Sequence, residues 1–358
     1  MFDSATLRGE AMDADYARER QRWEPVVEIT QIKGDSETHP SLSPEDAFAD
    51  FETYTHYIQQ KPEPYDPRPG DYVRSGLRTG LTLESQIGEN PFRFGLIGST
   101  DSHTGLSSAE EPNFWGKMAK DSIPENKGPR TIAGGPTGWS MSASGLAAVW
   151  AEDNTRGAIL EAFTRREVYA SSGPRIRVRL FAGWDFEEAD LEAFDPALGY
   201  ARGVPMGGEL PPVSGPTESA PRLLVTALKD PESANLDRIQ VVKGWIDSDG
   251  ETHEQVYDVA WSGNRSLNEE GQLPEVGDTV DRRTGQTADT IGAPSLQALW
   301  QDPDFDPALG AFYYARVLQI PTARHSLLDA IALGQEPAND YPQVIQERAY
   351  TSPIWYQP

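Results

Sequence analysis

The sequence predicts a mixed fold, with an α/β part over residues 1–173 followed by a β-rich, sandwich-like part over residues 174–358. Strand-like and helix-like segments alternate up to Tyr169, which is the pattern of β/α units. After Tyr169, short strand-like segments follow one another, and turns rich in Gly, Pro and Asp separate them. The pattern changes at Gly173-Pro174, where we expect the boundary between two domains.

The helices of the first part are predicted from their starting residues and apolar faces. Ser43 is a good N-cap, and Pro44 follows it in the first helical position. Asp71 precedes a second segment with leucines on one side, which Asp71 is expected to cap. In chain order, helices are expected over residues 13–23, from 43 to about 59, from 71 to about 87, and from 153 or 154 to 166.

Strands are predicted where apolar or β-branched residues follow one another without a helical period. Residues 26–32 and 94–100 are short continuous runs, which is typical of buried parallel strands. Residues 175–180 alternate arginine with apolar residues, as a half-buried strand does. Residues 144–150 form another apolar run. Further strands of the second part are expected over residues 222–227, 238–243, 255–261 and 311–320.

Residues 110–138 show no periodicity and are rich in Gly and Pro, with Trp115 among them. Long segments of this kind inside a compact domain are usually functional or flexible loops. Because this one follows the turn Asp101-Ser102-His103, we expect it to fold over that turn as a lid.

Composition and charge exclude several classes of function. Lys and Arg number 31 against 56 Asp and Glu, and the net charge of −25 repels nucleic-acid backbones and anionic membranes. The absence of cysteine excludes disulfide frameworks, thiol nucleophiles and Cys-based metal sites. No apolar run approaches the roughly 18 residues of a membrane span. We therefore expect a soluble protein of the cytoplasm or periplasm, whose metal sites use His, Asp and Glu.

Asp101 and His103 end the second predicted strand and are candidate metal ligands. Side chains two residues apart in an extended segment share one side, so a carboxylate and an imidazole can bind one ion. The carboxyl ends of strands are where α/β proteins place such sites. The alternative is that Asp101 caps the turn and His103 is a surface histidine or a hydrogen-bonded core histidine.

Glu28 is the second candidate metal ligand, because it lies in the middle of the apolar strand predicted over residues 26–32. Burying a carboxylate there is costly unless it is paired or bound to a metal. The alternative is a salt bridge to an arginine of a neighbouring helix. The sequence does not distinguish these two interpretations.

Lys33, Glu37 and His39 lie in the polar segment that follows this strand and are candidate catalytic residues. Lys33 offers a cation for an anionic substrate group, and Glu37 or His39 offers a metal ligand or an acid–base group. The alternative is an ordinary polar loop between a strand and a helix. The remaining histidines are given no role: His56, His253 and His325.

Several longer segments resemble the bacterial family called domain of unknown function 3604, and they occur in the same order along the whole chain. They are EPVVEITQIKGDSETH (24–39), FGLIGSTDSHT (94–104), VWAEDNT (149–155), REVYASSGPR (166–175), FYYAR (312–316) and QERAYTSPIWY (346–356). The family is related to the polymerase-and-histidinol-phosphatase (PHP) superfamily. The resemblance implies a distorted β/α barrel that holds divalent metal ions such as Zn, Mn or Fe, with Glu28, Asp101 and His103 among the ligands.

The chain resembles the C-terminal half of this family, whose N-terminal half carries a His-x-His motif and further histidine ligands. The resemblance therefore implies an incomplete barrel followed by the β-rich part. We expect a missing N-terminal half or a second chain to supply the remaining strands.

The functional hypothesis is a metal-dependent hydrolase of PHP type, or its C-terminal part, acting on a small phosphate or sulfate ester. The negative surface argues against polyanionic substrates, nucleic acid and membranes. The alternative is a catalytically silent protein that binds a ligand or a partner. In that case Trp245 and Trp261 would serve as stacking platforms for carbohydrate, unless they pack in the core.

Overall fold

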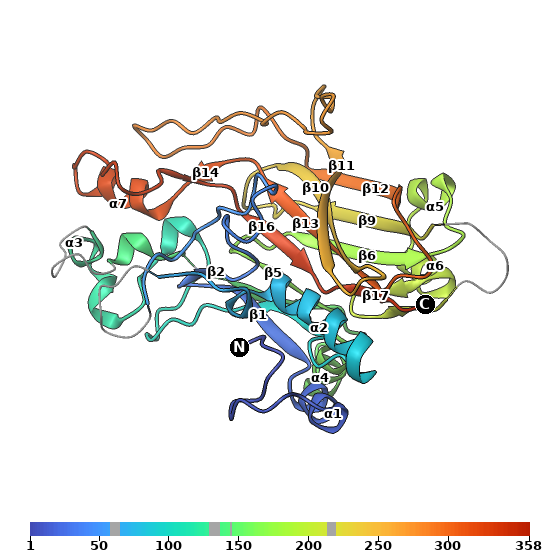
Figure 1. The fold of residues 1–358 in the computed structure, drawn as a ribbon. Helices are drawn as coiled ribbons and strands as arrows, with labels where there is room; N and C mark the ends of the chain where they lie inside the picture. Colours follow the sequence, from blue (N-terminus) through green and yellow to red (C-terminus); the bar gives the residue numbers. More distant parts are fainter. Residues whose placement is uncertain (58–64, 129–136, 144, 213–219) are drawn as a thin grey trace.

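The computed structural model describes residues 1–57, 65–128, 137–143, 145–212 and 220–358 (Figure 1). These residues form a mixed α/β fold dominated by an eight-stranded, a four-stranded and a three-stranded sheet, with one further two-stranded pair. The β-rich character predicted for the second part is confirmed. In the described part of the chain no sheet closes on itself, so the PHP-like barrel implied by the resemblance is not confirmed.

Helices are few and lie mostly at the ends of the molecule (Figure 1). They are α1 Ala14–Trp23, α2 Val73–Ile87, α3 Pro124–Lys127, α4 Arg156–Arg165, α5 Glu188–Glu192, α6 Pro196–Arg202 and α7 His325–Ala332. Short 3₁₀ turns cover Pro69–Asp71, Glu111–Asn113, Ala119–Ser122 and Gly138–Ser140.

The predictions for α1, α2 and α4 are confirmed within a residue or two. The carboxylate of Asp13 caps α1 by accepting a hydrogen bond from Tyr16 N at 2.8 Å. The cap of α4 is Thr155, whose hydroxyl accepts from Ala158 N at 3.3 Å, rather than the Asp or Asn before it. Asp71 ends the 3₁₀ turn before α2 instead of capping that helix.

The helix predicted from residue 43 to 59 is wrong, because its described residues form turns and extended chain. Ser43 does not cap a helix but donates a hydrogen bond to Glu254 on a distant strand. Asp46, predicted for a first helical turn, instead forms an ion pair with Arg316. Long-range polar contacts thus override the local helix signal. The last two residues of the predicted helix lie outside the described residues.

A small sheet brings the two predicted apolar strands of the first part together. It comprises β1 Val26–Gln31, β2 Gly34–Asp35 and β3 Gly95–Gly98 in the order β2-β1-β3. β1 and β3 are parallel, with Val26 opposite Gly95 and Thr30 opposite Gly98. Their carboxyl ends therefore lie side by side, as the sequence predicts.

The large sheet has the order β11-β10-β13-β16-β5-β4; β17 pairs with β13, and β8 pairs with β17. Its strands are β4 Leu146–Val149, β5 Val168–Ser171, β8 Glu209–Leu210, β10 Leu236–Ile246, β11 Thr252–Trp261, β13 Ala311–Gln319, β16 Arg348–Thr351 and β17 Ile354–Tyr356. The other strands are β6 Arg177–Gly183, β7 Val204–Pro205, β9 Arg222–Leu228, β12 Ser295–Gln301, β14 Thr322–Ala323 and β15 Val344–Ile345. All five strands predicted after residue 174 are confirmed, as β6, β9, β10, β11 and β13.

The large and four-stranded sheets pack on one another and share the main hydrophobic core. Leu180 of β6 and Val225 of β9 are buried in one cluster with Val241 of β10 and Val317 of β13. The two sheets therefore bury apolar side chains in one shared core. Strands from both sides of the boundary expected at residues 173 and 174 share the large sheet, because β5 pairs with β16.

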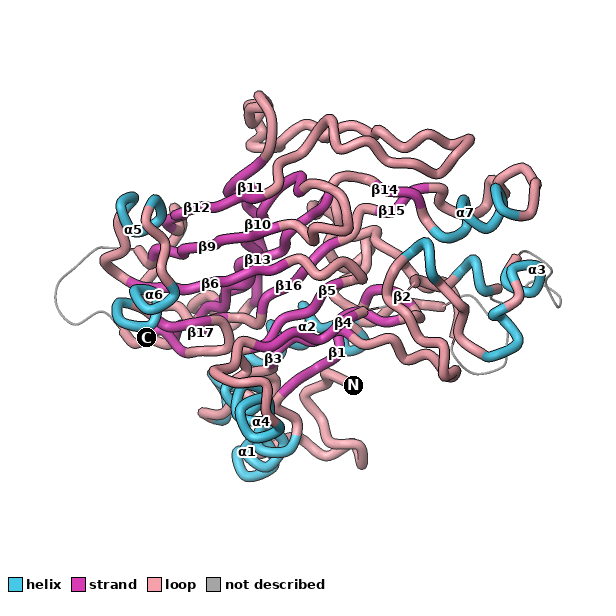
Figure 2. The backbone as a smooth tube through the Cα atoms, turned by 180° about the vertical axis from the view of Figure 1, so that it is seen from behind, coloured by secondary structure: helices cyan, strands magenta, loops and turns pink. Residues whose placement is uncertain are grey.

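The small sheet lies against β4 and β5, next to the large sheet (Figure 2). Gly98 makes this close approach feasible, since a Cβ atom there would lie only 2.8 Å from Leu146 N. Ser144, the first residue of the apolar run that becomes β4, lies outside the described residues. The packing fixes the carboxyl ends of β1 and β3 at the edge of the molecule where the candidate site lies.

Candidate functional site

The turns after β1 and β3 bring a lysine, an aspartate and a histidine together. Lys33, two residues after β1, forms an ion pair with Asp101 Oδ2. His103 Nε2 lies 3.5 Å from Asp101 Oδ1, so the carboxylate and the imidazole lie together, although the backbone at Asp101 is not extended as the prediction assumes. Asp101 has a φ of 47°, a backbone conformation that non-glycine residues adopt rarely and mostly at turns and functional sites.

Lys117 completes this group, and sequence reasoning did not identify it. Its Nζ lies 3.2 Å from Asp101 Oδ2 and 3.4 Å from His103 Nε2. His103 N in turn donates a hydrogen bond to Lys117 O at 2.7 Å. Lys117 belongs to the loop predicted to fold over the turn at residues 101–103, so the described part of that loop does contact this turn. Lys33, Asp101, His103 and Lys117 are called the rim cluster below.

The electrostatics of the rim cluster depend on the two neighbouring ammonium groups. Burial and the nearby Lys117 together lower the pKa of Lys33 to about 8, while the Glu28 carboxylate acts in the opposite direction. Glu28 accepts a hydrogen bond from Gln31 Nε2 at 2.6 Å. Among the described residues it has no arginine partner, so the salt bridge considered for it does not form there.

The described side chains do not complete a metal site. No three His, Asp or Glu side chains in this part of the chain come together as ligands for one ion. Asp101 and His103 supply two suitable donors, but two ammonium groups contact the Asp101 carboxylate. Glu28, the third expected ligand, is bonded to Gln31. Bound Zn, Mn or Fe therefore stays a prediction, and it requires further donors and a rearrangement of the lysines.

Glu37 and His39 lie away from the rim cluster. Glu37 is buried, with 1% of its surface exposed, and forms ion pairs with Arg74 and Arg316. His39 packs beside Tyr72, with ring centres 5.8 Å apart, and its Nδ1 lies 2.8 Å from the Ser41 hydroxyl. These contacts give Glu37 a structural role and leave His39 without a contact to the rim cluster.

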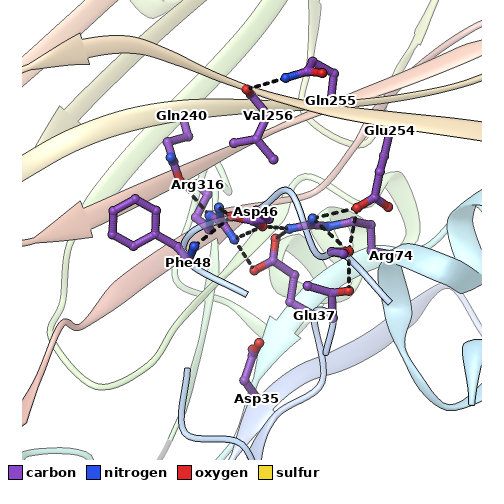
Figure 3. Close-up of polar contacts among 12 residues, drawn as sticks. Asp35, Glu37, Asp46, Phe48, Arg74, Gln240, Glu254, Gln255, Val256 and Arg316 are labelled. Carbon is purple, nitrogen blue, oxygen red and sulfur yellow. Dashed lines mark hydrogen bonds and ion pairs between the residues drawn. The ribbon is translucent and has the colours of Figure 1, made fainter. Parts of the chain in front are cut away.

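Glu37 belongs to a buried arginine network that also includes Asp46, Arg74 and Arg316 (Figure 3). Asp46 lies between the two guanidinium groups, with its oxygens 2.8 Å from Arg74 and 2.7 Å from Arg316. Both arginines lower the pKa of Asp46 well below its usual range. The network joins the loop after β1 to α2 and β13, which are distant in sequence.

A groove of about 1430 Å³ is lined in part by Asp46 of this network and lies apart from the rim cluster. It is bounded by residues 45–56, by β10 and β11, by residues 270–278 and by residues 340–348. Carboxylates outnumber cations along it, and several are exposed: Glu45, Asp50, Glu270, Glu275 and Asp340. Two of its arginines, Arg238 and Arg324, are paired with Asp258 and Glu52, which also line the groove.

A second buried ionic group surrounds Arg324, whose guanidinium donates two hydrogen bonds to Glu52 at 2.7 and 2.8 Å. Glu111 lies nearby and accepts a hydrogen bond from His325 N at 2.5 Å. Its other oxygen, Oε1, has no partner among the described residues. Burial, opposed by the Arg324 charge and supported by the Glu52 charge, raises the pKa of Glu111 to about 7. Burial also raises the pKa of Glu347 well above its usual range.

Replacing Glu111 by glutamine is expected to stabilise the protein at pH 8 but not at pH 5. A carboxyl whose pKa rises on folding favours the native state below its unfolded value of 4.5 and loses that contribution as the pH rises towards 7. Glutamine cannot ionise and keeps an oxygen acceptor for His325 N. Urea unfolding at the two pH values should show a gain on the order of 2 kcal/mol at pH 8 alone.

The matched control for this prediction is Glu110→Gln, because the Glu110 side chain is 42% exposed and pairs with Arg175. It should change stability little at either pH. Equal stability of Glu111→Gln and wild type at pH 8 would contradict a raised pKa at this buried carboxyl.

Three comparisons with known proteins give one match. A family model described as "Protein of unknown function (DUF3604)" matches residues 1–358. Neither the curated proteins nor the solved structures contain a match to the chain. In the described residues, no helix combines the length and apolar character needed to cross a membrane.

Proposed function

Because the chain belongs to the family described as Protein of unknown function (DUF3604), whose description names no activity, we propose a function from the rim cluster. The protein is a metal-dependent hydrolase of PHP type, or the C-terminal part of one, and acts on a small phosphate or sulfate ester. The observation that supports this proposal is the convergence of a carboxylate, an imidazole and two ammonium groups where two parallel strands end.

Each residue of the rim cluster has a role in this proposal. Lys33 and Lys117 bind the anionic oxygens of the ester, as ammonium groups do at phosphate and sulfate sites. His103 offers its imidazole as a metal donor, and a bound ion would supply the activation of the attacking water. Asp101 positions both the imidazole and the lysines. Asp101 and His103 are also this chain's contribution to metal binding, and the remaining donors lie beyond this pair.

The test compares the wild type with the double variant Asp101→Ala, His103→Ala. Hydrolysis of a panel of phosphate and sulfate monoesters should fall at least about 10²-fold, because both proposed metal donors of the rim cluster are removed. Elemental analysis of the same samples should show that Zn, Mn or Fe bound to the wild type is lost.

A matched control is the variant Asp247→Ala, His253→Ala. This remote pair also joins a carboxylate to an imidazole, at 2.6 Å, and both side chains are partly exposed. Its activity and metal content should equal those of the wild type. Absence of metal and of ester hydrolysis in the wild type, even after incubation with excess ions, would overturn the proposal for this chain.

A second candidate function is ligand or partner binding without catalysis, and the large groove favours it. The tryptophans considered as platforms do not support it. Trp245 stacks on His253 at 5.2 Å and packs against the main core, and Trp261 donates a hydrogen bond to Arg265 O. The ester panel separates the two functions, because a silent protein would hydrolyse none of its members.

A further inference from the structure

We propose that the ester bound at the rim cluster is amphiphilic, with one anionic head and an alkyl or aryl group as its organic part. This inference rests on the proposed function, since it names the substrate class of the same site. It is carried by exposed apolar side chains beside the cluster, by the two lysines, and by the charge of the whole protein.

The segment that carries His103 and Lys117 exposes four large apolar side chains. Their exposed fractions are 50% for Leu106, 39% for Trp115, 42% for Met118 and 53% for Ile123. Exposed apolar residues scattered singly over a surface need no explanation, but several along one functional segment indicate a binding surface.

Two backbone contacts join this segment to His103. His103 N donates to Lys117 O, and His103 forms a parallel bridge with Met118. The backbone of Met118 is therefore next to that of His103, and Met118 directly follows Lys117. Trp115 lies two residues before Lys117, and its indole N–H is fixed by Asn113 Oδ1 at 2.8 Å. A tryptophan fixed at its polar edge offers its apolar surface to a ligand.

The charges determine what the polar end of the ligand is. Lys33 and Lys117 share the single carboxylate of Asp101, so an anionic head can compete for their ammonium groups. Two lysines suffice for one sulfate or phosphate group. The net charge of −25 disfavours binding of a polyanion or of an anionic lipid surface. The ligand that fits is therefore a single small molecule with one charged head.

The experiment measures the affinity of wild-type protein for n-alkyl sulfates of two, four, six and eight carbons, below their micelle-forming concentrations. Isothermal titration should show affinity increasing roughly fourfold for each methylene that is buried. Trp115→Ala and Leu106→Ser should each flatten this dependence on chain length. Lys117→Met should weaken all four ligands by a similar factor, because it removes a contact to the shared head.

The matched control is Trp23→Ala, since Trp23 is 67% exposed on α1 and lies outside this segment. It should leave the whole chain-length series unchanged. Inorganic sulfate should bind no better than ethyl sulfate. Vesicles containing phosphatidic acid should not retain the protein, and retention would overturn the proposal in favour of a lipid surface.

The outcomes separate this inference from the proposed function. Ester hydrolysis with an affinity that ignores chain length would overturn the amphiphilic ligand and leave the hydrolase intact. Chain-length-dependent binding that Trp115→Ala abolishes, without any hydrolysis, would support the ligand class and overturn the hydrolase. An affinity that rises with chain length equally in Trp115→Ala and Leu106→Ser would show that the apolar group binds elsewhere, and would also overturn the proposal.

Discussion

Replacing Arg316 by alanine is expected to destabilise the protein by about 3–5 kcal/mol, because it leaves two buried carboxylates without half of their compensating charge. Arg316 is completely buried, and its guanidinium lies 2.7 Å from Asp46 and 2.9 Å from Glu37 (Figure 3). Arg74 alone would face both acids, and a carboxylate without its partner in a low-dielectric interior is costly. The gap left by the missing side chain adds to this loss.

The loss should depend on pH in a defined direction. Arg316 and Arg74 hold the pKa of Glu37 and Asp46 below their usual values, so the ion pairs stabilise the protein above the unfolded pKa values and fade as the pH falls. The difference in unfolding free energy between the wild type and Arg316→Ala should therefore become smaller below about pH 4. Urea unfolding at pH 7 and at about pH 3 measures the two differences.

Arg283→Ala is the matched control for Arg316→Ala, because the Arg283 side chain is 88% exposed and lies 3.8 Å from its acidic partner. Such exposed pairs contribute about 0–1 kcal/mol. A loss below 1 kcal/mol for Arg316→Ala would mean that water or Arg74 alone compensates the charges of Glu37 and Asp46. That outcome would contradict the role proposed for Arg316 in the buried arginine network.

The rim cluster illustrates what local sequence patterns can and cannot predict. Asp101 and His103 were identifiable because a carboxylate and an imidazole follow an apolar strand directly, but the turn that brings them together has a left-handed residue at Asp101 rather than the extended backbone assumed. Lys33 was identifiable because it follows the neighbouring strand. Lys117 was not, since nothing local to residue 117 indicates which turn its loop will reach. Its position depends on a bridge between segments that only the folded chain brings together.

The same reasoning explains the errors in the predicted fold. Ser43 and its acidic neighbours have the local signal of a helix start, but Asp46 is used by arginines far away in sequence. Glu37 looked like a polar loop residue with possible chemistry, whereas burial among arginines makes it structural. The strand β16 was missed because Arg348–Thr351 is short and fully buried, so its residues do not alternate. In each case a long-range contact decides the outcome, and a local pattern cannot specify it.

Replacing Arg324 by alanine is expected to cause a loss of similar size, about 3–5 kcal/mol, but with a different local consequence. Arg324 is buried and forms a two-bond ion pair with Glu52. It also donates hydrogen bonds to the carbonyl oxygens of Trp139 and Met141, at 2.9 and 2.6 Å. One side chain thus connects the loop after β1 and the residues before β4 to the start of α7. Without it, Glu52 loses its partner and two buried carbonyl groups lose their donor.

The loss of unfolding free energy caused by Arg324→Ala should grow as the pH rises, whereas the loss caused by a cavity lined by neutral groups would not depend on pH. Arg324 faces Glu111, whose pKa is about 7, so its removal costs more where that carboxyl ionises. We expect the loss in unfolding free energy to be larger at pH 8.5 than at pH 6, and Arg324→Lys, which restores the charge but not the two-bond geometry, to be intermediate. Hydrogen exchange should show faster exchange around residues 111–113 and 137–143 in the alanine variant. If Arg324 joins these segments electrostatically, its removal must speed hydrogen exchange in them. Destabilisation without faster exchange at residues 111–113 and 137–143 would mean that Arg324 contributes through packing instead.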